Sequence, residues 1–199
     1  MAWEGHLIYA RSSAVEFWRY VGIHQLEPVC AIVRTLSLRN VSLIAAVVSC
    51  LIQVGAQLFA VVVVVATVTE APPRSLAMLA GKYGYDSGPF WDVVPMVTGV
   101  LLLVAVATNW TTSRRSLLLG AAVAFIVAGL FAAFVMDPVQ ADVVSAGYSD
   151  SVDEGLRARA AWWYTLDWIS WTLSLVVGLL LLIALATPVP DRIRPRPAV

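Results

Sequence analysis

Charged residues are scarce in this chain of 199 residues. They make up 13% of it, whereas soluble domains carry about 25%. Hydrophobic residues make up 60%, and this composition excludes both a soluble globular protein and a disordered one. Thirteen basic residues are balanced by thirteen acidic ones, so the chain has no excess positive charge with which to bind a nucleic-acid backbone. Lipid is therefore the expected solvent for most of the sequence.

Cysteine and histidine are also rare. The two cysteines, Cys30 and Cys50, form no CxxC motif, which argues against a disulfide-stapled domain and against a thiol oxidoreductase. The two histidines, His6 and His24, precede the first apolar run, so they cannot ligate a haem iron from two membrane helices. The sequence shows neither zinc-ligand spacing nor a phosphate-binding glycine loop, and we expect no metal and no cofactor.

Four apolar runs are long enough to cross the hydrocarbon core of a bilayer, which needs about 20 helical residues. They cover residues 41–69, 93–110, 116–136 and 169–187. The sequence thus predicts an all-α, integral membrane four-helix bundle over residues 41–187, preceded by residues 1–40 and followed by a tail over 188–199. Glycine and proline are frequent in residues 70–92, where we expect little regular structure.

The charges between the spans predict the orientation of the chain. Nine basic residues fall in residues 1–40, in the turn at Arg114 and Arg115, and after Thr187, whereas four fall in the loops on the other side. Cytoplasmic segments carry the excess of Lys and Arg in membrane proteins. Both termini are therefore expected to be cytoplasmic, in a plasma membrane of the bacterial type.

Two capping-box patterns predict further helices. Ser13 and Glu16 open an amphipathic segment that ends before Pro28, and we expect a helix lying at the membrane interface, with docking to a partner as the alternative. Ser151 and Glu154 predict the start of a helix that runs into the fourth span.

Few polar residues lie inside the spans. Ser49, Gln53 and Gln57 recur every four residues on one face of the first span, and glutamine amides in hydrocarbon must find hydrogen-bond partners. Bonds between helices are one interpretation; the floor of a ligand cavity, with both glutamines as binding residues, is the other. Small residues from Gly120 to Ala132 on the third span predict the close approach of another helix.

Acidic and aromatic residues gather at the span ends expected on the outer side. Asp137 closes the third span, and Tyr164, Asp167 and Trp168 open the fourth. The two aspartates are candidate catalytic residues, because burial can divide a pair of carboxylates into an acid and a base. Tyr164 and Trp168 are candidate ligand-binding residues. The alternative is a solvated acidic rim, since carboxylates at helix N-termini are favoured by the helix dipole.

Three stretches carry a resemblance to a known family: FWDVVPMVTGVLLLVAVATNW, the pair Arg114-Arg115, and SDSVDEGLRARAAWWYTLDWISWTLSL. Over residues 55–187 the chain resembles a family of small four-span membrane proteins that includes the anthrone-oxygenase-like proteins. The resemblance implies cofactor-independent oxygenation of a polycyclic phenolic substrate, with Asn109 as a candidate catalytic residue. Where family members often have an Asn and an Arg before the fourth span, this chain has Asp167 and Ser170.

Two functional hypotheses follow. The first is a non-catalytic accessory or lipid-environment protein, whose partners are the lipid bilayer and other membrane proteins or further copies of itself. The second is a small membrane enzyme that acts on an apolar or polycyclic substrate between the spans. The first predicts a filled bundle in which both glutamines bond to neighbouring helices; the second predicts a pocket of about 300 Å³ or more that reaches the polar residues.

Overall fold

The computed structural model describes residues 37–189. The chain divides into two compact units, Met1–Val41 and Ser42–Val199. In the first unit the description covers only residues 37–41, at the beginning of α2 (Leu38–Phe59). The expected amphipathic helix before Pro28, both histidines and Cys30 lie outside the described residues.

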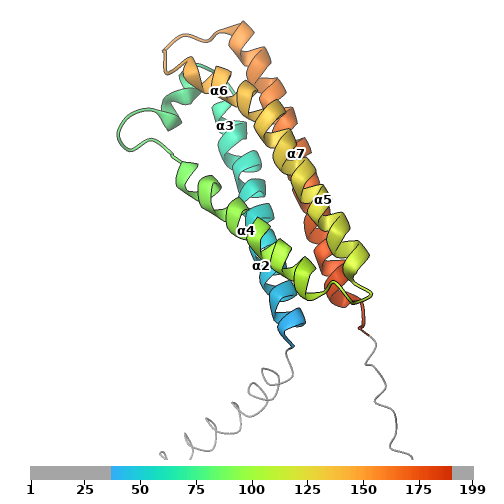
Figure 1. Cartoon of the computed structure of the whole chain (residues 1–199). Helices are drawn as coiled ribbons and strands as arrows, with labels where there is room; N and C mark the ends of the chain where they lie inside the picture. The colour runs from blue at the N-terminus through green and yellow to red at the C-terminus, as the bar shows by residue number, and fades with distance from the viewer. Residues whose placement is uncertain (1–36, 190–199) are drawn as a thin grey trace, which may run out of the picture. The chain divides into compact units, whose positions relative to one another are not determined.

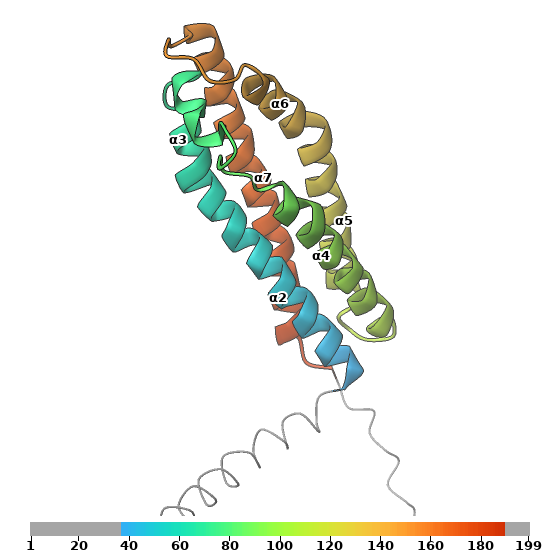
Figure 2. The ribbon, with the colours of Figure 1, turned by 90° about the vertical axis from the view of Figure 1, so that its left-hand side faces the viewer.

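Helices and loops make up the described chain, and residues 37–189 contain no β-strand. The first long helix combines α2 with the π-helical η1 (Ala60–Val65) and with α3 (Ala66–Val68), and the short 3₁₀ helix η2 (Arg74–Leu79) follows it. After α4 (Gly88–Thr108), the third long helix combines α5 (Arg115–Phe131), the π-helical η3 (Ala132–Met136) and α6 (Asp137–Ser145), and α7 (Glu154–Ala186) is the fourth. Figures 1 and 2 show these helices in two views.

Four of these helices are long and apolar enough to cross a membrane: Leu38–Val68, Gly88–Thr108, Arg115–Ser145 and Glu154–Ala186. The predicted all-α fold with four apolar helices is therefore confirmed, and it indicates a multi-pass membrane protein. Large apolar side chains such as Leu103, Val123 and Ile183 are more than half exposed along the outer faces of these helices, as expected where lipid is the solvent.

Two of the helices extend beyond the predicted spans. The third continues past Pro138 to Ser145 through η3, whose wider backbone turn precedes the proline. The fourth begins at Glu154, two residues after the start that a capping box at Ser151 predicts, because its cap is Asp153. The Asp153 carboxylate accepts the first free N–H groups of the helix, from Gly155 at 2.8 Å and Leu156 at 3.1 Å.

The second helix is much shorter than the other three. It has 21 residues, against 31, 31 and 33, so it is about 15 Å shorter than its neighbours at 1.5 Å per residue. Its C-terminal end meets the start of α5 through a short turn, and the missing length is therefore at its N-terminal end (Figure 1). There the loop between α3 and α4 takes the place of about three helical turns.

One half of the bundle, which we call the closed half, is filled by apolar side chains from all four helices. Its core includes Leu43 on α2, Leu102 on α4, Leu118 on α5 and Leu181 on α7, each 2% exposed or less. Side chains of α2 pack over Gly178 of α7, where an added Cβ would lie 3.7 Å from a methyl group of Leu51, in ordinary van der Waals contact. Small residues allow such approaches between membrane helices.

Polar side chains in the closed half bond to one another. The hydroxyl groups of Ser42 and Thr108 lie 2.7 Å apart, and those of Ser49 and Thr98 lie 2.8 Å apart, so both pairs link α2 to α4. Buried Arg114, in the turn before α5, donates from Nε to the carbonyl of Thr187 at 2.9 Å. It therefore binds a carbonyl at the end of α7, where the helix dipole also favours a cation.

The opposite half, which we call the open half, has a smaller core. Val68, Leu76, Val143 and Leu156 pack there with neighbouring apolar residues from α3, η2, α6 and α7. The two loops at this end meet where the N–H of Asp153 donates to the carbonyl of Pro72 at 3.1 Å. Short α4 does not reach this core, and a space remains between the two cores.

Candidate ligand cavity

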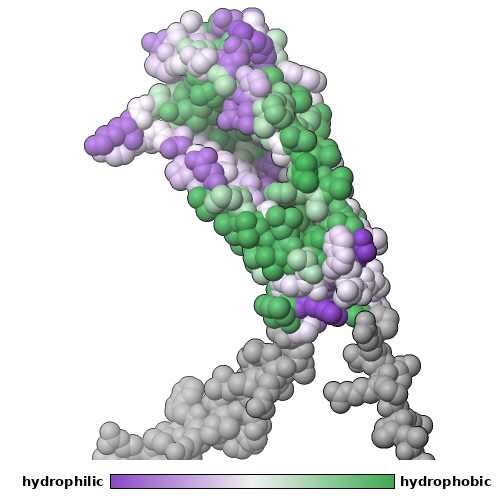
Figure 3. All heavy atoms as spheres, viewed as in Figure 1, coloured by the Kyte–Doolittle hydropathy of each residue, from purple (hydrophilic) through white to green (hydrophobic). Residues whose placement is uncertain are grey.

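A cavity of about 700 Å³ occupies this space. Residues from all four long helices line it, together with the loop that precedes α4. Its volume lies within the range of about 300–1,000 Å³ that is typical of small-molecule sites. In Figure 3 the hollow is visible above α4, with hydrophilic residues in and around it and hydrophobic surface along its flanks.

Two features of the backbone shape the cavity besides the shortness of α4. Both π-helical turns border it, η1 through Val64 and Val65 and η3 through Ala132 and Met136. Turns of this kind widen a helix locally and are frequent at functional sites. The π-helical turns thus lie on two sides of the cavity, in helices that come from different parts of the chain.

The small residues of the third span have two different roles. An added Cβ at Gly120 would lie 4.0 Å from Leu180, so this residue packs against α7 as predicted. Ala128 and Ala132 line the cavity. The third long helix approaches α7 along α5 and η3, as the ridge predicted, and the second half of the ridge borders the cavity in addition.

The inward face of α7 forms one wall of the cavity and supplies three of its polar residues, Asp167, Ser170 and Ser174. Trp163, Asp167, Ser170, Ser174 and Val177 all line the cavity and are all buried. They follow one another at intervals of three or four residues, which places them on a single helical stripe. Sequence reasoning missed the two serines, although this spacing, extended from Asp167, would have found them.

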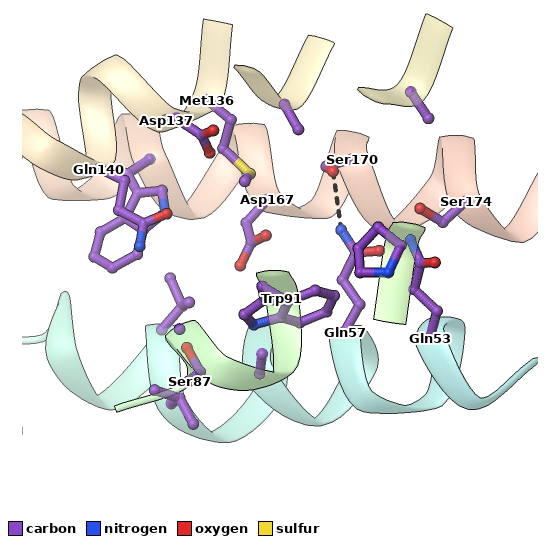
Figure 4. Close-up of a pocket in the computed structure, with 18 of the residues that line it drawn as sticks. Gln53, Gln57, Ser87, Trp91, Met136, Asp137, Gln140, Asp167, Ser170 and Ser174 are labelled. Carbon is purple, nitrogen blue, oxygen red and sulfur yellow. Dashed lines mark hydrogen bonds between the residues drawn. The ribbon is translucent and has the colours of Figure 1, made fainter. Parts of the chain in front are cut away.

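Asp167 is the most isolated polar group in the cavity. Its residue is 6% exposed, and its carboxylate makes no hydrogen bond or ion pair with any of the residues 37–189. Figure 4 shows the carboxylate pointing from α7 into the cavity, toward Trp91 on α4. The expectation that Asp167 opens its helix is wrong, because α7 begins more than three turns earlier, and a solvated rim does not describe this residue.

The two candidate glutamines of α2 both line the cavity. Gln57 is 6% exposed and donates from Nε2 to the Ser170 hydroxyl at 2.9 Å, which joins α2 to α7 (Figure 4). Its Oε1 has no partner, and the buried Oε1 of Gln53 has none either. Both interpretations of these residues thus hold in part: one amide links two helices, and two acceptor atoms remain available in the cavity wall.

The other residues of the cavity lie nearer to its rim. Asp137, the second candidate catalytic residue, lines the cavity at the start of α6 and is exposed. Trp91, whose ring packs edge-on against Phe90, and Pro95 line it from α4. Because Pro95 has no N–H, it cannot donate the usual helical hydrogen bond to the carbonyl of Trp91.

Three sequence candidates lie away from the cavity. Tyr164 packs against the core of the open half, and its ring meets that of Trp168 edge-on with 6.3 Å between centroids. Trp168 also contacts the ring of Trp171, at 5.5 Å, and does not line the cavity. Asn109 is fully buried at the end of α4, where its Nδ2 donates to the Ala105 carbonyl at 3.0 Å. These residues are therefore not brought together with Asp137 and Asp167.

The charged groups of the cavity are all acidic. Asp86, Asp137 and Asp167 line it, and no lysine, arginine or histidine of the described chain does. Arginines at the start of α7 have carboxylate partners elsewhere, since Arg159 lies 2.8 Å from Asp142 and Arg157 lies 3.7 Å from Glu154. Within residues 37–189 there is also no group of three or more His, Cys, Asp and Glu side chains that could hold a metal ion.

The loop between α6 and α7 carries one interaction of its own. The hydroxyl group of Tyr148 donates a hydrogen bond to the carboxylate of Asp150. This bond, and the negative charge of Asp150, raise the pKa of Tyr148 above its usual value. Neither residue lines the cavity.

Comparisons with protein-family models, with curated proteins and with solved structures found no match. The resemblance to the small four-span family stays a prediction, and so does the oxygenase chemistry that it implies. The cavity is therefore the feature of this protein from which a function can be proposed.

Proposed function

We propose that this protein binds a small amphipathic molecule inside its helix bundle, with the polar end of the ligand at Asp167 and the apolar part against the aliphatic walls. The single observation that carries this proposal is the cavity of about 700 Å³ with an unpartnered, buried carboxylate pointing into it. A cavity of this size, with apolar walls and a few convergent polar groups, is the usual form of a ligand site.

Energetic considerations support a binding role over a purely structural one. An unpaired polar group buried away from water costs about 1–3 kcal/mol, and a charged one costs more. The two glutamine oxygens are such groups, and the carboxylate of Asp167, in a residue that is 6% exposed, faces the same cavity without a partner among residues 37–189. A bound molecule or ordered water that pairs with these groups offsets this cost. A bundle with a purely structural role would instead be expected to have a filled core without such groups.

Membrane access favours a ligand from the bilayer. The cavity is bounded on one side by α4 and on another by Ala128, Ala132 and Met136 of the third long helix. Above the N-terminal end of α4 these two sides are not joined by a helix (Figures 1 and 3). The hollow that Figure 3 shows there is the opening through which we propose that an amphipathic molecule enters the cavity.

An enzymatic role is the second candidate, because both candidate catalytic aspartates line the same cavity. One is buried and the other is exposed, so their environments differ as an acid–base pair requires. The oxygenase version has less support, since Asn109 lies outside the cavity lining. The accessory role stays a prediction.

Photolabelling tests the binding proposal. The purified full-length protein, in phosphatidylcholine nanodiscs, is irradiated with a diazirine derivative of 1-octanol, and labelled residues are identified by peptide mass spectrometry. We expect labelling to concentrate on cavity-lining residues such as Gln53 and Ser174, relative to lipid-facing residues such as Leu103.

Two matched variants separate the cavity from the lipid-facing surface. Ala132→Trp fills the cavity and is expected to abolish labelling of its lining, whereas Ala133→Trp, at an exposed neighbouring position outside the lining, leaves it unchanged. Equal labelling of lining and lipid-facing residues in the unmodified protein would overturn the proposal.

A further inference from the structure

We infer that the ligand of this cavity is an organic cation, an apolar molecule with an ammonium group that pairs with the carboxylate of Asp167. This inference rests on the proposed binding function and adds the chemical class of the ligand. It follows from the charges, the aromatic ring and the acceptor atoms that face the cavity.

The charge of the cavity wall is the first argument. Three carboxylates line it and no cationic side chain of the described residues does. Asp167 is the deepest of them, with 6% exposure and no hydrogen-bond partner among residues 37–189. A buried carboxylate is stabilised by a counter-charge or by hydrogen-bond donors, and residues 37–189 supply neither to Asp167, so a ligand with an ammonium group would supply both.

Aromatic and amide groups in the cavity wall also favour a cationic ligand. Figure 4 shows the Asp167 carboxylate and the Trp91 ring on opposite sides of the same space. An ammonium group between them contacts an anion on one side and an electron-rich ring on the other, and tryptophan is the aromatic residue that attracts cations most strongly. The unpartnered Oε1 atoms of Gln53 and Gln57 supply further acceptors for its N–H groups.

The size and walls of the cavity distinguish an organic cation from a metal ion. A space of about 700 Å³ is far larger than one hydrated ion requires. Most of its lining is apolar, including the aliphatic side chains of Val54, Val65 and Val177. The geometry therefore points to a ligand whose apolar part fills the space and whose charged end reaches Asp167.

A pair of probes of equal length tests the ligand class. The diazirine derivatives of 1-octylamine and of 1-octanol are compared in phosphatidylcholine nanodiscs, which carry no net charge. For each probe, labelling of cavity-lining residues is divided by labelling of lipid-facing residues in the same sample. We expect this ratio to be about tenfold higher for the amine, as a charge-assisted hydrogen bond in a buried site implies.

The variant Asp167→Asn keeps the shape of the side chain and removes its charge. It is expected to bring the amine ratio down to that of the alcohol, while labelling by the alcohol persists and shows that the cavity is intact. Asp92→Asn is the matched control, because Asp92 is an exposed aspartate on α4 that does not line the cavity. It is expected to leave both ratios unchanged.

The outcomes separate this inference from the proposed function. If the alcohol labels the cavity and the amine labels it no better, the cation inference is wrong and the binding function stands. If neither probe labels the lining above the lipid-facing background, both are wrong. An amine preference that survives in Asp167→Asn would also overturn the assignment of the charge to this residue.

Discussion

The closed and open halves of this bundle differ in the number of long helices that pack in them and in the polar bonds that α2 makes to its neighbours. In the closed half, Ser42 bonds to Thr108 and Ser49 bonds to Thr98. In the open half, Gln53 and Gln57 each leave an amide oxygen without a partner. The two glutamines follow Ser49 on the same face of α2, one and two turns along.

Helix length explains the difference. Where α4 runs beside α2, its threonines meet the serines and its leucine fills the core. The N-terminal turns of α4 border the cavity through Trp91 and Pro95, and beyond its first residue the fourth helix does not continue, so the space between the other three helices is left partly unfilled. A functional site can thus arise in a bundle simply because one of four helices ends early.

The largest expected effect comes from placing the same large side chain in each half. Gly178→Leu should lower the free energy of unfolding by about 3 kcal/mol, because an added Cβ there already touches Leu51, Cys50 and Val54. Gly129→Leu should change it by less than about 1 kcal/mol, since nothing lies within 4 Å of that position. Unfolding by SDS in mixed micelles measures both; equal losses would show that the open half is packed as tightly as the closed one.

A smaller loss is expected when the buried cation of the closed half is removed. Arg114→Met should cost about 2 kcal/mol, because the carbonyls of Leu185 and Thr187 at the end of α7 lose a charged donor. Arg115→Met is the control: Arg115 is exposed and lies over the ring of Trp110, 3.9 Å from its centroid, an interaction of about 0.5–1 kcal/mol. The same unfolding assay, and hydrogen exchange at the C-terminal turn of α7, would detect the loss; a larger effect for Arg115 would contradict it.

The smallest effects should have opposite signs in the two halves. Gln53→Leu removes an unpaired acceptor, so we expect a gain of up to about 1 kcal/mol together with weaker labelling of the cavity by the octylamine probe. Ser49→Ala, one turn away, removes the partner of Thr98 and should lose about 0.6 kcal/mol without affecting labelling. A loss of stability in Gln53→Leu would mean that this amide is already satisfied.

Much of the fold could be predicted from the sequence, because lipid imposes a simple rule on long apolar runs. The number of long helices, the capping pattern before α7 and the low charge of the spans all follow from composition and periodicity. The positions of the helix ends were predicted less accurately. Polar residues such as Asp137 and Asp167 interrupt the apolar runs, while the backbone continues as a helix through them. Asp167 was therefore predicted at a helix terminus when it lies inside one.

The candidate site could be predicted only in part. Gln53, Gln57, Asp137 and Asp167 were singled out and all line the cavity, whereas Tyr164, Trp168 and Asn109 do not. Hydropathy and spacing indicate which residues are unusual in a membrane span, but they do not give the rotation of one helix about its axis. Tyr164 and Trp168 share a helix with Asp167, yet they fall on other faces of it.

The sequence by itself determined that the chain has four long apolar helices, because this depends on runs of residues along one segment. Only the tertiary structure decided that the end left open by α4 would be a cavity, and that one carboxylate would point into it without a counter-ion. The physical reason is that a partner, or the lack of one, is set by contacts between helices that are distant in the chain, and no local pattern records those contacts.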